Sequence, residues 1–193
     1  MSPVLESKNI RLRPLQRTDA QALVNAASDG ELWSLSFTAI PSADNISDYV
    51  NLALEGQVQG TVLPFVVIDK SSDTIIGTTR FWKIDKKNRN LEIGHTWYSA
   101  SWQRTSANTE SKFLLLTYAF EILNCIRVQF TTDVLNERSQ CAISRLGAQK
   151  EGVIRNERIM PDGRFRDSIR YSIIDSEWRK VKKDLETKML KYH

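Results

Sequence analysis

A polar segment, WQRTSANTESK from Trp102 to Lys112, leads into the strongly apolar stretch FLLLTYAFEIL. This order predicts the start of a buried α-helix. A helix start presents backbone N–H groups without intrahelical acceptors and the positive end of the helix dipole, so it can bind phosphate. An ordinary capped helix is the alternative, with Ser106 or Asn108 as the cap and Glu110 in the first turn. The residues that could surround a phosphate are Gln103, Arg104, Thr105, Ser106, Ala107, Asn108 and Thr109.

A carboxylate and an imidazole lie just upstream, in the strand-like segment LEIGHTWY. Glu92 could act as a general base, a role typically worth about 10²–10⁴ in rate. A surface or edge glutamate is the alternative. His95 is the rival base, and a hydrogen-bonded core histidine is the other interpretation of that residue. Strict alternation predicts two faces, one with Leu91, Ile93, His95 and Trp97 and the other with Glu92, Gly94, Thr96 and Tyr98.

A third polar pair opens the segment NERSQCAISRLG. Asn136 suits the N-cap of a short helix, and Gly147 is placed for its C-cap. Ser139 falls in one stripe with Ala142 and Leu146, so it should face inward with them. A hydroxyl there could donate a hydrogen bond to a leaving group. The alternative is a serine that bonds the backbone of its own helix start.

Alternating strand-like and helix-like segments must position these side chains. Strands are expected from alternation and β-rich composition, and helices from apolar periodicity and capping signals. The expected strands are 5–14, 62–69, 74–84, 91–99, 126–131, 151–160 and 164–174. The expected helices are 18–30, 45–56, 108–123 and 136–146, with a C-terminal helix from Asp175. We expect one domain over residues 1–193.

Composition narrows the classes of protein. The 193-residue chain has a net charge of +4 and a pI near 9.1, a mild excess that suits a polyanionic ligand or a solvated surface. No apolar run approaches the roughly 20 residues of a membrane span, so a cytoplasmic protein is expected. Cys125 and Cys141 are expected to be reduced structural thiols, with Cys141 a small buried hydrophobe. The only histidines, His95 and His193, predict no metal site.

These motifs together resemble the GNAT acyl-CoA N-acetyltransferases, whose phosphate loop reads Gln/Arg-x-x-Gly-x-Gly/Ala. Gln103 matches the first position, whereas Ser106 and Asn108 stand where the glycines are expected. The run Asn-Thr-Glu at 108–110 and the tail NERSQCAISRLGAQKEG are similar to the branch of ribosomal-protein amino-terminal acetyltransferases. The resemblance implies the α+β GNAT fold, a mixed, mostly antiparallel sheet of about seven strands flanked by about four helices plus a C-terminal helix.

The resemblance also implies the chemistry. A primary amine would attack acetyl-CoA directly and take its acetyl group. The expected amine is above all the N-terminal α-amine of a protein or peptide. A small-molecule amine acceptor and a non-catalytic acyl-CoA-binding module are the alternatives. No membrane and no direct nucleic-acid partner are expected, and a homodimer is left open.

Each candidate residue takes a role under this resemblance. Glu92 would be the base, and Ser139 would hydrogen-bond or protonate the leaving thiolate. Asn136 would bind the pantetheine arm, and a backbone N–H near Trp97 or Tyr98 would polarise the thioester carbonyl. The aromatic residues expected to line the acceptor groove are Trp33, Phe37 and Trp82.

Overall fold

The computed structural model describes residues 3–35 and 40–191. Within them, eight strands form one sheet: β1 Leu5–Glu6, β2 Ile10–Pro14, β3 Leu63–Asp69, β4 Thr74–Asp85, β5 Asn90–Tyr98, β6 Arg127–Asp133, β7 Gln149–Ile159 and β8 Phe165–Ile174. Their order in the sheet is β1-β2-β3-β4-β5-β6-β8-β7. Neighbours are antiparallel except for β5 and β6, which run parallel.

Five α-helices in the described residues accompany the sheet: α1 Ala20–Ser28, α2 Ile46–Val58, α3 Ala107–Thr117, α4 Glu137–Arg145 and α5 Asp175–Leu190. A π-helical turn, Tyr118–Ile122, extends α3. Short 3₁₀ turns cover Arg17–Asp19, Leu32–Ser34 and Ala100–Trp102. No helix among the described residues is both long and apolar enough to span a bilayer.

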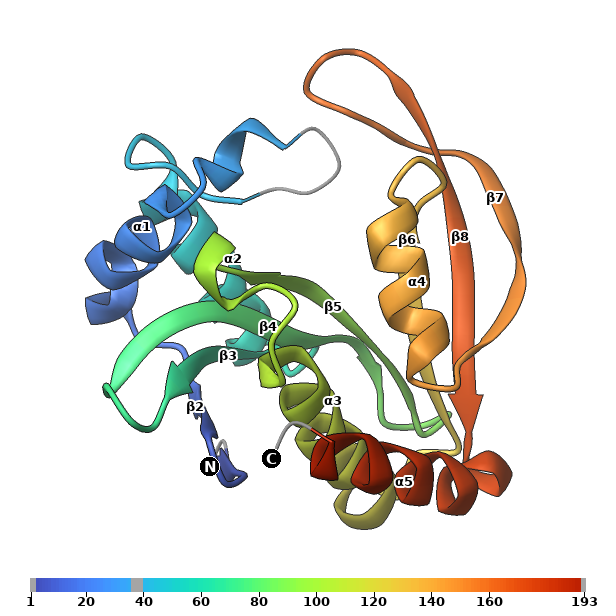
Figure 1. The fold of residues 1–193 in the computed structure, drawn as a ribbon. Helices are drawn as coiled ribbons and strands as arrows, with labels where there is room; N and C mark the ends of the chain where they lie inside the picture. The colour runs from blue at the N-terminus through green and yellow to red at the C-terminus, as the bar shows by residue number, and fades with distance from the viewer. Residues whose placement is uncertain (1–2, 36–39, 192–193) are drawn as a thin grey trace.

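Two apolar clusters hold the helices against the sheet. Helices α1 and α2 pack on one face, where Leu23 and Val50 meet Val66 and Trp97. Helices α3, α4 and α5 contribute to the cluster on the other face. This cluster includes Leu115, which is completely shielded from solvent. Figure 1 shows α1 and α2 apart from α3 and α5, with the sheet between them. The expected mixed α+β GNAT architecture is therefore confirmed.

The first expected strand, residues 5–14, is in fact two short strands, which raises the count from about seven to eight. Side chains of the turn between β1 and β2 bind to the start of α3. Ser7 Oγ donates to Glu110 Oε2 at 2.5 Å, and Asn9 Nδ2 donates to Glu110 Oε1 at 2.9 Å. These bonds tie the turn to the start of α3.

Candidate active site

Strands β5 and β6 separate after three residue pairs. Their ladder joins Asn90 to Arg127 and ends at the pair Glu92–Gln129. From there β5 continues beside β4, and β6 continues beside β8, so the two strands diverge (Figure 1). The edge of β5 that faces away from β4 therefore has backbone groups free for a ligand.

A β-bulge in β5 changes which face each side chain occupies. Between Gly94 and Trp97, β5 has one residue more than the facing part of β4, and His95 has a positive φ of 49°. An extra residue reverses the alternation beyond it. Trp97 accordingly packs with α1 and α2, whereas Tyr98 packs on the α3 face with Ile93. The prediction of strict alternation along β5 is thus wrong beyond Gly94.

Glu92 lies at the end of the β5–β6 ladder and is only 2% exposed. The interpretation as a surface glutamate is therefore wrong. Its Oε2 accepts from Gln129 Nε2 at 2.8 Å and pairs with Lys83 Nζ at 3.2 Å. Both of these contacts with described residues fall on Oε2, so Oε1 is the oxygen that could accept a proton from an amine or a bridging water.

His95 is a poor base at neutral pH. Its ring meets the Trp82 ring edge-on at 4.8 Å between centroids, so it shares the face of Trp82 rather than the predicted apolar face of Leu91. Burial first, and then the positive charges of nearby arginine and lysine side chains, lower the pKa of His95 to about 3. A group with so low a pKa gives little driving force for proton abstraction near pH 7.

The start of α3 is held by its own polar side chains. Thr105 Oγ1 donates to the Trp102 carbonyl at 2.8 Å and accepts from the Ala107 N–H at 3.2 Å. Ser106 Oγ donates to Glu110 Oε1 at 2.6 Å. Asn108 and Thr109 lie in the first turn, where N–H groups lack intrahelical acceptors. The turn is thus rigid and open to an anion.

Glu110 is a structural anchor. Burial alone would raise its pKa, but hydrogen bonds from Ser106, Ser7 and Asn9 outweigh burial and keep the pKa below its ordinary value. The carboxylate therefore stays ionised and fixes the first turn of α3 to the turn between β1 and β2.

Two loop residues before α3 replace the flexibility of glycine with specific bonds. Arg104 adopts a left-handed φ of 64°, a conformation for which glycine is the usual residue. Gln103 Nε2 donates to the Tyr98 carbonyl at 3.1 Å, and Gln103 Oε1 accepts from Arg138 Nη2 at 2.6 Å. The loop therefore keeps a tight turn without the two glycines of the family pattern.

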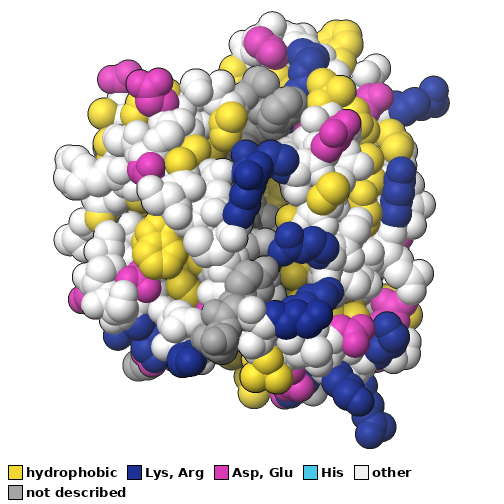
Figure 2. Space-filling model, viewed as in Figure 1, with side chains coloured by type: hydrophobic (Ala, Val, Ile, Leu, Met, Phe, Trp, Pro, Cys, Tyr) yellow, Lys and Arg dark blue, Asp and Glu magenta, His cyan; other side chains and the backbone are white. Residues whose placement is uncertain are grey.

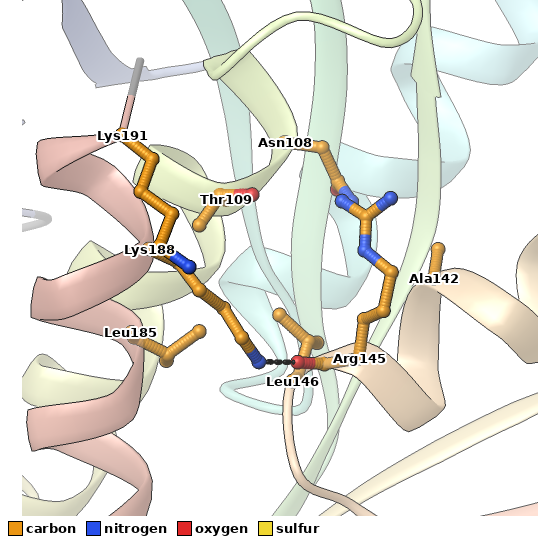
Figure 3. Close-up of a pocket in the computed structure, with 8 residues that line it drawn as sticks. All are labelled: Asn108, Thr109, Ala142, Arg145, Leu146, Leu185, Lys188 and Lys191. Carbon is orange, nitrogen blue, oxygen red and sulfur yellow. Dashed lines mark hydrogen bonds between the residues drawn. The ribbon is translucent and has the colours of Figure 1, made fainter. Parts of the chain in front are cut away.

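A cavity of about 210 Å³ opens beside the start of α3. In Figure 3 the Arg145 guanidinium extends toward Asn108, while Lys188 and Lys191 approach from α5. Lys188 Nζ donates to the Arg145 carbonyl. Figure 2 shows Lys and Arg side chains gathered near the middle of the face of the molecule that is seen in Figure 1. The residues that line the cavity include three cations and no carboxylate: Asn108, Thr109, Ala142, Arg145, Leu146, Leu185, Lys188 and Lys191.

Helix α4 forms as its sequence predicts. Asn136 Oδ1 accepts from the Ser139 N–H at 3.0 Å, which confirms the N-cap. Gly147 has a φ of 97°, as a helix C-terminal glycine should. Ser139 lies one turn before Ala142, which lines the cavity. The serine thus belongs to the α4 face that turns toward the start of α3.

The three aromatic residues expected in an acceptor groove have different outcomes. Trp82 lies on β4 directly opposite Glu92. Trp33 lies in the turn Leu32–Ser34 and is 40% exposed. Phe37 lies outside the described residues. Of the two described residues, Trp82 is therefore the one that pairs directly with the candidate base across the ladder.

The cysteines differ from expectation in one case. Both are free thiols, and Cys125 is buried. Cys141 is exposed, so its interpretation as a small buried hydrophobe is wrong. The physical reason is that α4 has a single buried residue, Ile143, and presents its other faces to solvent or to the cavity.

Sequence reasoning missed a buried lysine. Lys112, in α3, is 5% exposed, and its Nζ lies 2.6 Å from Thr96 Oγ1 and 3.3 Å from Thr79 Oγ1. Burial lowers its pKa to about 7. The signal was present in the sequence, because Lys112 stands one residue before the apolar run FLLL in a helix expected to be buried.

The comparisons with known proteins agree with this geometry. The family model described as Acetyltransferase (GNAT) domain matches residues 9–149, and the chain belongs to this family. It is an acyl-CoA-dependent acetyltransferase that transfers an acetyl group to an amine. Members of the family use acetyl-CoA.

Individual relatives extend the similarity over nearly the whole chain. The N-acetyltransferase p20 of Bacillus licheniformis, itself uncharacterized, is 30% identical over 90% of this chain and 97% of that protein. YdaF of Bacillus subtilis, provisionally named a ribosomal N-acetyltransferase, is 31% identical over 54% of this chain and 56% of that protein. A GCN5-related N-acetyltransferase structure from Brucella melitensis superposes with a TM-score of 0.86 at 27% identity, covering 97% of this chain and 85% of the other.

Proposed function

We propose that the acceptor is the N-terminal α-amine of a protein or peptide, and that this amine attacks the thioester carbonyl directly, without an acyl-enzyme. The observation that carries this proposal is the buried Glu92 at the point where β5 and β6 diverge, beside a free strand edge. An α-amine titrates near 8 and a lysine amine near 10.4, so an α-amine loses its proton more easily. One carboxylate is then more readily sufficient as its base. The provisional name of YdaF supports a protein acceptor.

The residues present fit acetyl-CoA. Phosphates of the cofactor would bind the first turn of α3, with Arg145 and Lys188 supplying positive charge from the cavity wall. The pantetheine arm would lie along the unpaired edge of β5, near the backbone N–H groups of Trp97 and Tyr98. Asn136 would contact the arm from the start of α4. The bound thioester supplies an activated acetyl carbonyl.

The chain's own groups then divide the proton chemistry. Glu92 Oε1 takes a proton from the amine as the new C–N bond forms. A β5 backbone N–H stabilises the developing charge on the carbonyl oxygen, an effect typically worth a few kcal/mol. Ser139 donates a hydrogen bond to the sulfur as the C–S bond breaks and the thiolate leaves. The products are the acetylated amine and coenzyme A.

Removing a cavity charge is expected to weaken cofactor binding. Arg145→Met or Lys188→Met should each raise the Kd for coenzyme A roughly tenfold, since a hydrogen bond to a charged group contributes about 1.5–3 kcal/mol. Isothermal titration calorimetry measures the effect. Lys180→Met is the matched control, because Lys180 lies on the same helix with a side chain 86% exposed and paired to Asp184. Unchanged affinity in both cavity variants would remove the cavity from the cofactor site.

The acceptor class is tested by thiol release from acetyl-CoA with a panel of amines. We expect release with peptides that have a free N-terminus and none with the same peptides blocked at that end. Peptides with a blocked N-terminus and a free lysine separate α-amines from ε-amines, and polyamines and amino acids represent small acceptors. Release only with small amines would replace this proposal by a small-molecule acetyltransferase.

A further inference from the structure

Four cationic side chains surround the face of the sheet that carries Glu92. Arg80 pairs across the ladder with Gly94, next to His95. Arg158 and Arg166 face each other across the β7–β8 ladder. All four lie close enough to His95 to lower its pKa electrostatically. We call this set the acceptor-side cations; its members are Arg80, Lys83, Arg158 and Arg166.

Trp82 connects the set geometrically. The Lys83 ammonium lies 4.3 Å and the Arg158 guanidinium 5.4 Å from the centre of the Trp82 indole ring. The indole Nε1–H is buried and has no hydrogen-bond acceptor. It lies over Gly94, where an added Cβ would come within 2.7 Å of Nε1. A free donor and several cations therefore converge beside the candidate base.

The described carboxylates balance only part of these charges. Glu157, which lies 3.7 Å from Arg170, attracts Arg166 electrostatically. Lys83 pairs with Glu92, and Arg166 lies 3.8 Å from Asp133, which Arg164 already binds at 2.6 Å. Arg80 and Arg158 have no carboxylate within 4 Å in the described part of the chain. Arg80 is nevertheless only 5% exposed, with its guanidinium 4.6 Å from the centre of the Tyr49 ring.

A nearly buried guanidinium without an anionic partner is unfavourable in the unliganded protein. Its burial becomes favourable if the bound acceptor brings the missing anion. Glu92 does not supply this anion. It faces the same side of the sheet as Arg80, but Lys83 already neutralises its charge.

We propose that Arg80 and Arg158 form a carboxylate-binding subsite, so that the enzyme selects acceptors with an acidic residue close behind the reacting amine. The inference rests on the proposed peptide acceptor and specifies its sequence class. The guanidinium fork binds a carboxylate with two parallel hydrogen bonds. The same cations favour the neutral, nucleophilic form of the incoming amine.

The test compares peptides that differ in one charge. Each pair has Glu or Gln at position 2 or at position 3, and kcat/KM is measured by thiol release. For the wild type we expect a preference for the Glu peptide of about tenfold or more at low salt, decreasing as NaCl screens the charges. Free glutamate and glutamine serve as a second pair, which separates an acidic side chain in a peptide from a small amino acid.

Two variants locate the preference. Arg158→Gln should reduce the Glu-to-Gln ratio severalfold, and Arg80→Gln should reduce it further toward one. Arg155→Gln is the matched control. Arg155 is, like Arg158, an exposed arginine on β7, but of the two only Arg158 lies over the Trp82 ring, so Arg155→Gln should keep the wild-type ratio. Thermal unfolding checks that Arg80→Gln is folded; if it is not, Arg158→Gln decides alone.

The outcomes separate the two proposals. The carboxylate subsite would be overturned by equal rates with Glu and Gln peptides, or by a Glu-to-Gln ratio that is unchanged in Arg158→Gln. Either result would leave the proposed peptide acceptor intact. No release with any peptide would instead overturn the proposed function. A preference confined to free glutamate would assign the subsite to a small amino acid.

Discussion

Glu92→Gln is expected to lower kcat/KM for acetyl transfer by about 10²–10⁴, the usual contribution of a general base. Glutamine keeps the shape of the side chain and an oxygen that can accept from Gln129, but it cannot take a proton from the amine. In the wild type the rate should rise with pH as the amine loses its proton. The variant should keep the wild-type affinity for coenzyme A, whereas the dependence of its rate on pH should differ from that of the wild type.

Initial rates of thiol release between pH 6 and 10, together with calorimetry for coenzyme A, measure both effects. Glu6→Gln provides the control, since it removes a surface carboxylate that pairs with Arg11 and Lys70 far along the sheet at β1. A wild-type rate and an unchanged pH profile in Glu92→Gln would mean that another group, or water alone, accepts the proton.

Lys112 is expected to make the folded protein more stable as the pH rises from about 7 toward 10. Its ordinary pKa is 10.5, and burial lowers it to about 7 in the folded state. Between these values the unfolded chain keeps the proton and the folded chain does not. The unfolded state thus binds more protons, so the free energy of unfolding increases with pH, by at most about 1.4 kcal/mol per unit.

Urea unfolding of the wild type and Lys112→Met at pH 7, 8 and 9 tests this expectation. Methionine preserves most of the aliphatic stem and removes the charge. The difference between the two proteins isolates Lys112 from other groups whose pKa changes on folding, such as Cys125, whose pKa burial raises. We expect that difference to change by about 1 kcal/mol per pH unit in favour of the wild type. Parallel stability profiles would show that Lys112 remains charged in the folded protein.

Local chemistry made several elements predictable. The N-cap at Asn136 and the left-handed Gly147 depend only on residues within one helix, and the structure shows both. The start of α3 at Ala107 follows from the change between a polar segment and an apolar one. The motifs around these elements also indicated the GNAT family, which the comparisons confirm.

The faces of β5 could not be predicted, because they depend on a partner strand. The extra residue at His95 exists only in register against β4, and periodicity along one strand cannot show it. The contacts of the turn between β1 and β2 are similar, since its residues bond Glu110, about a hundred residues later. Cys141 was wrongly predicted to be buried, because spacing along a helix does not show how much of that helix the neighbouring elements cover.

By itself, the sequence determined the order of strands and helices, the capped start of α4, and the family to which the chain belongs, because short-range spacing and local hydrogen bonding encode these features. Only the tertiary structure decided that Glu92 is buried at the divergence of β5 and β6, that Lys112 lies beneath the sheet, and that Arg80 has no carboxylate within 4 Å among the described residues. Those properties depend on which distant side chains exclude water or supply charge, and that information exists only once the strands have paired.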